Sequence, residues 1–185
     1  MKLRHFDHDG RARFITFSTF RHMPVLSNAL FRGIVVDSID QARIAFGFRL
    51  LAYVVMPDHV HLVIIPRIDS NVGHLVGEIK RISARGVHAA LKGRESDLPG
   101  KLMVVRNGRT RFALWQRRCY DHSCRTDESI WEKVTYCHQN PVRRGLVDDP
   151  TDWPWSSCRW YQAYSGPLPE IDCPANIQSP HPPSR

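Results

Sequence analysis

The feature that most constrains the fold is the stretch of residues 53–66. Two apolar runs rich in β-branched residues flank the turn residues 56–58, and this pattern predicts two strands joined by a tight turn. Because side chains alternate between the faces of a strand, His59 and His61 are expected to point the same way and Val60 the other. Two imidazoles about 7 Å apart at their Cα atoms can bind one divalent metal, although the pair does not choose which. A solvated strand face is the simpler interpretation of this stretch alone.

A second segment, residues 126–141, has the spacing of an amphipathic helix. Asp127 fits an N-cap, and the residue type at position 141 predicts the end of the helix near Asn140, because a proline disfavours the α region for the residue before it. The expected buried stripe consists of Ile130, Val134 and Cys137. Tyr136 and Asn140 are four residues apart and therefore share one edge of this helix. On these residues alone, a polar helix edge without chemistry is the favoured interpretation.

The patterns along the rest of the chain predict the element order β-α-β-β-α-β-α. The expected strands are residues 13–20, 49–56, 59–66 and 118–125. The first two expected helices begin at a cap, Ser27 or Asn28 and then Ser70 or Asn71, and run to about Phe46 and Leu91. The first six elements form a split βαβ, or ferredoxin-like, arrangement. We therefore expect an α+β fold, an antiparallel sheet with helices on one face, followed by a C-terminal helix that carries Tyr136.

Glycine and proline interrupt residues 93–108, which are expected to form a loop. The length of 185 residues suits one domain with a substantial core, and we place that domain at residues 1–165. Six prolines crowd residues 166–185, so this tail is expected to be largely disordered. No apolar run approaches the roughly 20 residues of a membrane span, and the first residues lack a signal-peptide core. These features predict a cytoplasmic, nucleoid-associated protein with no membrane partner.

The five cysteines are scattered and odd in number, which favours reduced thiols over a disulfide framework. Cys119 and Cys124, with His122 between them, could form part of a zinc site. For these three residues a zinc site is the less favoured interpretation, and ordinary reduced thiols are the favoured one.

The net charge of +8 and the pI of about 9.6 favour a polyanionic partner. Five arginines fall within thirteen residues: Arg106, Arg109, Arg111, Arg117 and Arg118. Phe112 and Trp115 lie among them, and Tyr120 follows. Cations that hold phosphates beside aromatic rings that stack on bases suit single-stranded nucleic acid. A solvated basic loop over a core that uses the aromatic side chains is the alternative.

Together these segments resemble the single-tyrosine transposases of the histidine-hydrophobic-histidine (HUH) class, and in particular one branch, the REP-associated tyrosine transposases. The resemblance covers the chain from about Arg13 to Tyr164. The motifs that carry it occur in the order of the family: the histidine pair at 59–61, a Trp-Gln-x-Arg stretch at 115–118, an aromatic-x-His stretch at 120–122, the tyrosine helix at 136–147 and a Trp-Pro-x-Ser motif at 152–157.

The resemblance implies that Tyr136 is the nucleophile, which would become linked to a 5′ phosphate and leave a free 3′ hydroxyl. It also implies His59, His61 and Asn140 as ligands of Mg²⁺ or Mn²⁺, and single-stranded DNA with a hairpin, of the REP palindrome type, as substrate. Free phenol has a pKa near 10, so Tyr136 needs help at neutral pH. A metal on the two histidines would polarise the scissile phosphate and orient it for in-line attack.

Cationic side chains are the expected DNA contacts: Arg117, Arg118, Arg143, Arg144, Lys80, Arg81 and Arg111. Tyr120 is the alternative nucleophile, and His138 is left open as a ligand, a base or a surface residue. Two other functions remain to be separated from strand transfer: a sequence-specific DNA-binding module that does not cut, and a metal-dependent hydrolase that uses water. The expected assembly is a monomer or a homodimer.

Overall fold

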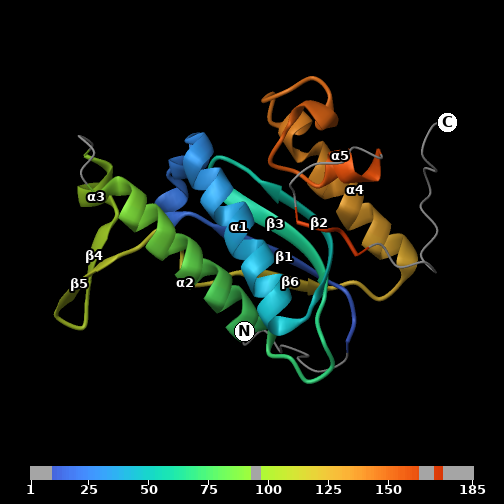
Figure 1. Cartoon of the computed structure of the whole chain (residues 1–185), viewed down its shortest axis with the longest axis horizontal. Coiled ribbons are helices and arrows are strands. Elements are labelled where there is room, and N and C mark those ends of the chain that lie inside the picture. The colour runs from blue at the N-terminus through green and yellow to red at the C-terminus, as the bar shows by residue number, and fades with distance from the viewer. Residues whose placement is uncertain (1–9, 93–96, 163–168, 173–185) are drawn as a thin grey trace.

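The computed structural model describes residues 10–92, 97–162 and 169–172 (Figure 1). Its elements are, in chain order, β1 (Arg13–Ser18), η1 (Phe20–His22), η2 (Val25–Ser27), α1 (Ala29–Phe46), β2 (Arg49–Val55), β3 (His59–Ile65), α2 (Val72–Leu91), α3 (Leu98–Lys101), β4 (Met103–Arg106), β5 (Arg109–Phe112), β6 (Tyr120–Ser123), α4 (Asp127–Arg143), η3 (Pro150–Asp152) and α5 (Cys158–Tyr161). The main sheet has the strand order β2-β3-β1-β6, and every pair in it is antiparallel. This is the split βαβ order, so the predicted ferredoxin-like fold is confirmed.

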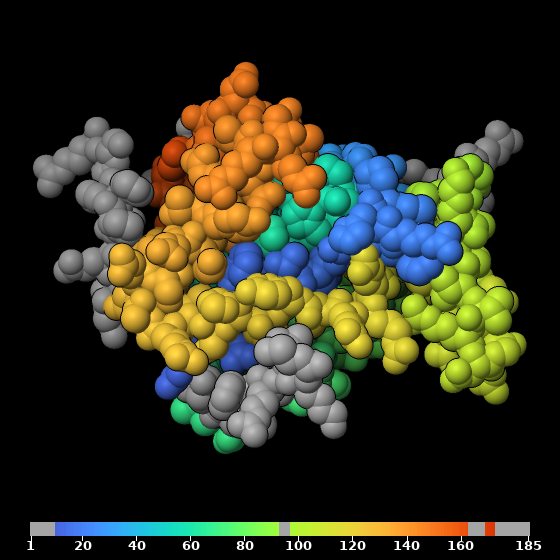
Figure 2. Space-filling model, turned by 180° about the vertical axis from the view of Figure 1, so that it is seen from behind, coloured from blue at the N-terminus to red at the C-terminus, as the bar shows by residue number. Residues whose placement is uncertain are grey.

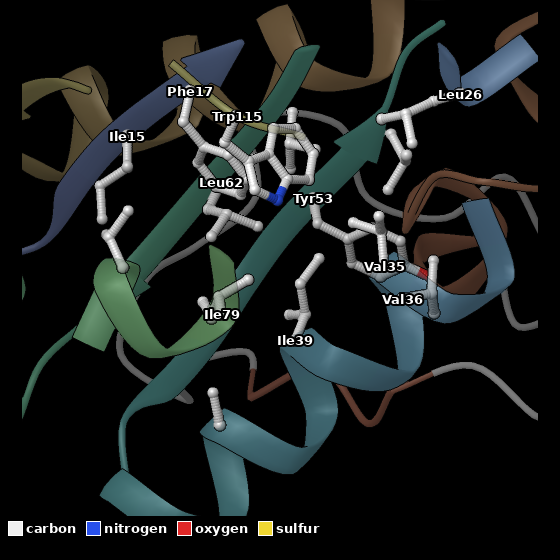
Figure 3. Close-up of a cluster of buried hydrophobic side chains, with 14 of the residues drawn as sticks. Ile15, Phe17, Leu26, Val35, Val36, Ile39, Tyr53, Leu62, Ile79 and Trp115 are labelled. Carbon is white, nitrogen blue, oxygen red and sulfur yellow. The ribbon is translucent and has the colours of Figure 1, made fainter. Parts of the chain in front are cut away.

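Helices α1 and α2 cover one face of the sheet and bury its larger apolar cluster (Figure 1). Figure 3 shows side chains that strands and helices contribute to this cluster, among them Ile15, Phe17, Tyr53, Leu62, Val35, Ile39 and Ile79. The predicted asparagine caps are present, because Asn28 accepts a hydrogen bond from the Leu30 N–H and Asn71 accepts one from the His74 N–H. Gly47 ends α1 in the left-handed region, which a residue without Cβ adopts at little cost.

Helix α4 covers the opposite face and buries a second apolar cluster, which includes the predicted stripe Ile130, Val134 and Cys137. Two details of the prediction were wrong. The N-cap is Thr126 and not Asp127, since Thr126 and Ser129 form a reciprocal capping box. The helix also passes through Pro141 to Arg143, because the buried proline lies in the last turn and the next N–H groups still find carbonyl partners there.

The expected loop at residues 93–108 was wrong for most of its described part, since it contains α3, β4 and the start of a hairpin with β5. Asn107 and Gly108 both have positive φ, 51° and 69°, as the two central residues of a type I′ hairpin turn require. The Asn-Gly pair between residues 103–106 and 109–112 was therefore a signal for a β-hairpin, and the prediction of a loop did not take it into account. Residues 93–96 lie outside the described residues.

The outer edge of β2 is covered by residues 153–157, here called the edge segment. The Val55 N–H donates to the Trp155 carbonyl at 2.8 Å, the Ser157 N–H to the Tyr53 carbonyl at 3.0 Å, and the Trp153 indole N–H to the Val55 carbonyl at 3.1 Å. The last motif of the sequence resemblance therefore satisfies an edge strand that would otherwise expose unpaired backbone groups.

The predicted domain boundary at residue 165, and most of the predicted tail, lie outside the described residues. Within the described part of the tail, Ile171 is buried against the larger apolar cluster. Asp172 exchanges two hydrogen bonds with the Leu50 backbone, each 2.8 Å long. Across the described ranges, no helix has the length and apolar content that a membrane span requires.

Candidate active site

His59 and His61 lie on β3 and face α4, as the strand alternation predicted. Their ring centroids are 4.6 Å apart at an interplanar angle of 75°. The two residues are only 7% and 5% exposed, so they do not form a solvated face. Phe14 of the neighbouring strand β1 stacks on His61 at 5.2 Å. Two rings that contact each other inside an apolar setting are positioned to share one cation.

One nitrogen of each ring is already engaged. The Asp58 carboxylate lies 2.6 Å from Nδ1 of His59, and the Thr16 hydroxyl lies 2.7 Å from Nδ1 of His61. A carboxylate and a hydroxyl can both accept from an Nδ1–H, which leaves the Nε2 lone pair of each ring for a metal. Nε2 of His61 is buried and has no hydrogen-bond partner among the described residues. Such an orphaned buried atom fits a metal site.

The electrostatic setting keeps both rings neutral at pH 7. Burial, followed by the neighbouring His59 ring and the positive charge of Arg144, lowers the pKa of His61 to about 3. Burial also lowers the pKa of His59, although Asp58 opposes the shift. A neutral imidazole is the form that binds a metal. The histidines therefore need no deprotonation before a cation can bind.

Tyr136 lies on α4 directly beside the histidines. Its ring centroid is 5.2 Å from that of His61 and 5.7 Å from that of Phe14, both in edge geometry. Tyr136 is 36% exposed, so a substrate can reach it from solvent. The Arg143 guanidinium lies 5.2 Å from the Tyr136 ring centroid. Segments that are far apart in the sequence thus bring a phenol, two imidazoles and a cation together.

Asn140 is 5% exposed and lies one helical turn after Tyr136. Arg144, one turn further, is close enough to lower the pKa of both site histidines. Asn140 therefore lies between two residues that face the histidine pair. Within the described ranges, no group of three or more His, Cys, Asp and Glu side chains could hold a metal. The two neutral imidazoles, one of them with an unsatisfied Nε2, fit a divalent cation.

The predicted DNA-binding cations divide into two groups. The Lys80 ammonium donates to the carbonyls of Gln116 and Arg118 at 3.1 and 3.2 Å, and burial lowers its pKa. Arg81 is exposed but pairs with Glu78 at 2.6 Å. These two charges are engaged by the protein itself.

The other predicted cations have exposed side chains: Arg111, Arg117, Arg118, Arg143 and Arg144. Arg143 and Arg144 lie at the end of α4, close to Tyr136 and the histidines. Arg111 lies on the β4–β5 hairpin, on the other side of the molecule from α4 (Figure 1). The structure therefore places Arg111 away from the two arginines at the end of α4.

The aromatic residues of the basic stretch also divide. Trp115 is 6% exposed and donates from Nε1 to the Ser83 hydroxyl at 3.0 Å, so it belongs to the core. Phe112 is half-buried and stacks on His88. Tyr120 is 55% exposed and stacks on His122. The alternative in which the core uses the aromatic side chains thus holds for Trp115, while Tyr120 remains open to solvent.

His138, left open by the sequence, points away from the site. Its Nε2 lies 3.0 Å from the Ser157 hydroxyl, and burial lowers its pKa to about 4. This residue supports the edge segment. Sequence reasoning missed the Asp58 and Thr16 partners, although an aspartate next to a histidine in a turn is a recognisable pattern of ligand support. Cys119, His122 and Cys124 form no metal-binding group in the part of the chain that is described.

This chain is similar to known proteins in sequence and in fold. Residues 12–103 match the family model described as IS200-like transposase. A Haemophilus influenzae protein provisionally named REP-associated tyrosine transposase is 28% identical over 134 residues, which cover 66% of this chain and 70% of the relative. The REP-associated tyrosine transposase of Escherichia coli is 29% identical over 111 residues, which cover 60% of this chain and 54% of that protein.

Among solved structures, a REP-associated tyrosine transposase bound to a REP hairpin matches with a TM-score of 0.68 and 21% sequence identity. That alignment covers 100% of this chain and 98% of the other, and it supports the shared fold. The family match, the named relatives, the fold and the ordered motifs lead to one conclusion. This chain is similar to the IS200-like transposases, a family of DNA-processing enzymes, and among its relatives to the REP-associated tyrosine transposases.

Proposed function

We propose that this chain is a metal-dependent single-stranded DNA endonuclease and strand transferase in which Tyr136 forms a covalent phosphotyrosine. The observation that carries the proposal is the contact between Tyr136 and His61 at 5.2 Å, with Nε2 of His61 buried and without a partner. An unsatisfied buried polar atom costs about 1–3 kcal/mol. A cation held by His59 and His61 would remove that cost at the position where a phenol needs electrostatic help.

The chemistry is a transesterification in two stages. The Tyr136 oxygen attacks the scissile phosphorus, the new bond joins that oxygen to the 5′ phosphate, and the bond to the 3′ oxygen breaks. The phenolic proton is balanced by the proton that the 3′ oxygen gains as it becomes a hydroxyl. Attack by a 3′ hydroxyl on the phosphotyrosine reverses these bond changes and rejoins strands. The energy of the phosphodiester is kept throughout, so no nucleotide cofactor is required.

The residues of the chain have separate roles in this scheme. His59, His61 and Asn140 would hold Mg²⁺ or Mn²⁺, which when bound supplies Lewis-acid polarisation of the phosphate. Asp58 and Thr16 fix the ring orientation of the two histidines. Arg143, beside the Tyr136 ring, can hold a phosphate oxygen of the strand by a charge-assisted hydrogen bond. The exposure of Tyr136 leaves room for an unpaired strand.

We extend the substrate class from the relative that was solved with a REP hairpin to this chain, as part of the proposal. Hairpin DNA formed by palindromic repeats in the cytoplasm would be the substrate, and the protein would act as a monomer or homodimer. A DNA-binding module that does not cut would account for the basic surface. It would leave the orphaned imidazole beside an accessible tyrosine without a role.

The test is a denaturing gel of labelled single-stranded and hairpin oligonucleotides incubated with the protein and Mn²⁺. A slow-migrating protein–DNA band is expected with the parent chain and should be absent with Tyr136→Phe or in EDTA. Tyr120→Phe is the matched control and should still form the band. Cleavage that persists in Tyr136→Phe and disappears in Tyr120→Phe would overturn the assignment. Cleavage without any covalent band would favour the hydrolase that uses water.

A further inference from the structure

The β4–β5 hairpin, residues 103–112, is here called the arm. Its two strands pair only with each other, and it projects from the body of the domain (Figure 1). The register sets Val104 opposite Arg111 and Arg106 opposite Arg109. Because opposed and alternate residues share a face, Arg106, Arg109 and Arg111 all lie on one face of the arm. The arm is therefore a two-stranded ribbon with a basic side.

The three arginines are exposed, and none forms an ion pair with an acidic side chain in the described ranges. Arg106 and Arg109 face each other directly across the turn, and like charges in this position destabilise a hairpin. An array of phosphates would turn this repulsion into attraction. The charge pattern thus fits a polyanion better than it fits the free protein.

The base of the arm is fixed to the active site. Its root residues Leu102 and Ala113 are buried, and the Ala113 N–H donates to the Leu102 carbonyl at 2.7 Å. Next along the chain, Leu114 accepts a hydrogen bond from the N–H of residue 20 at 2.7 Å. The Thr19 N–H then donates to the Asp58 carbonyl at 2.8 Å, and residue 58 immediately precedes the first site histidine. Backbone bonds therefore connect the arm to the metal-site end of the sheet.

The arm can hold phosphates but is poorly equipped to stack on bases. Within the described residues it carries one aromatic side chain, Phe112, which is half-buried against His88. Unpaired bases bind proteins mainly by stacking on exposed aromatic rings, whereas a paired stem presents two lines of phosphates. A two-stranded β-ribbon also fits the roughly 12 Å width of a major groove. The occupant that suits the arm is a duplex.

We infer that the arm binds the paired stem of the DNA hairpin through its phosphates, while Tyr136 acts on an unpaired part of the same molecule. This inference rests on the proposed function for the identity of the substrate. Most of the arm lies beyond the residues matched by the family model, which end at 103. Figure 2 shows the arm in yellow-green at one side of the molecule and α4 in orange at the other, with the connecting chain in yellow between them.

The test compares salt titrations of binding, read by fluorescence anisotropy, for a stem-loop and for an unpaired oligonucleotide of the same length. Using the full chain with Tyr136→Phe and no metal removes cleavage from the measurement. Each duplex phosphate contact contributes a log–log salt slope of about −0.9. Adding Arg106→Gln and Arg109→Gln should therefore reduce the slope by about 1.8 on the stem-loop and leave it unchanged on the unpaired strand.

Two controls keep the test decisive. Arg49→Gln with Arg67→Gln removes two exposed charges at the end of the sheet where β2 begins and β3 has just ended, and it should leave both slopes unchanged. Replacing Arg106 and Arg109 by lysine keeps the charges and should keep the parent slope. An unchanged stem-loop slope in the glutamine variant, or an equal loss on the unpaired strand, would overturn the inference. A failure of the proposed function would be seen in a different experiment, as the absence of the covalent protein–DNA band with the parent chain.

Discussion

Asp58 and Thr16 are the two side chains that hold the rings of the histidine pair. Each holds Nδ1 of one ring, at 2.6 Å for His59 and 2.7 Å for His61. That the two rings share a face could be predicted from the alternation of a strand. Their hydrogen-bond partners could not, because Thr16 reaches His61 only through the register of β1 on β3.

Removing one of these partners should weaken metal binding without removing a ligand. Asp58→Ala is expected to lower the affinity for Mn²⁺ by about 10–100-fold, the usual cost of losing support behind a ligating histidine. Mn²⁺ is expected to raise the melting temperature of the parent chain, and the same increase in Asp58→Ala should require correspondingly more metal. Asp58→Asn keeps an acceptor and should behave more like the parent. An Asp58→Ala chain with the parent's response to Mn²⁺ would contradict the role given to this carboxylate.

His138 makes a prediction about pH and stability. Burial lowers its pKa to about 4 in the folded chain, whereas an unfolded histidine has a pKa near 6.5. Below pH 6.5 the unfolded state therefore takes up a proton that the folded state refuses until about pH 4. As the pH is lowered through that window, this residue should make the free energy of unfolding fall by about 1.4 kcal/mol for each pH unit.

Chemical denaturation between pH 6.5 and 4.5 measures that slope, which reports the number of protons taken up on unfolding. His138→Gln should lower this number by about one. The difference between variant and parent isolates His138 from His61, whose lowered pKa acts in the same direction. Equal slopes in parent and His138→Gln would show that the ring is not held neutral by burial.

At the scale of elements, the helices and strands of the main sheet followed from periodicity, but the pieces around them did not. Two asparagine caps and the apolar stripe of α4 were readable in the sequence because they depend on neighbouring residues. The edge segment was recognised as a motif, yet its contact with β2 depends on residues about 100 positions away. Local rules carry no information about such contacts.

The edge segment should contribute measurably to stability through one serine. The Ser157 hydroxyl accepts from the Tyr53 N–H at 3.0 Å and lies 3.0 Å from Nε2 of His138, all in a buried position. Ser157→Ala leaves both partners unsatisfied and should cost about 1–3 kcal/mol for each, less any rearrangement. Thermal and denaturant unfolding measure the loss, with Ser70→Ala as a control at a half-buried serine. A Ser157→Ala chain as stable as the parent would contradict this.

At the scale of the whole molecule, the net charge of +8 predicted a polyanionic partner but not which cations would meet it. Lys80 and Arg81 were among the predicted contacts, and both are engaged within the protein. For Lys80 that outcome depends on the packing of α2 against a segment more than thirty residues away, which composition cannot reveal. Arg81 pairs instead with Glu78, three residues earlier on the same helix. The exposed arginines lie in separate places, at the end of α4, on the arm and on the chain that connects them.

The arginines at the end of α4 should serve the unpaired strand. Arg143→Gln with Arg144→Gln is expected to reduce the log–log salt slope by about 1.4 on single-stranded DNA, at about 0.7 for each contact. The loss should be the same on every sequence tested, since phosphate contacts do not read bases. The Arg49→Gln and Arg67→Gln pair again serves as the control of equal charge. A loss confined to one base position would mean that one of these arginines reads sequence.

The backbone bonds between the arm and the metal-site end of the sheet have a geometric consequence. Thr19 links the two regions, since its N–H donates to the Asp58 carbonyl while the next residue binds Leu114. A stem held on the arm would therefore lie at a fixed distance from the Tyr136 oxygen. The protein would act as a ruler, with the cut placed by a count of nucleotides from the foot of the stem and not by the bases at the cut itself. Moving the stem by a few nucleotides would carry the cleavage position with it.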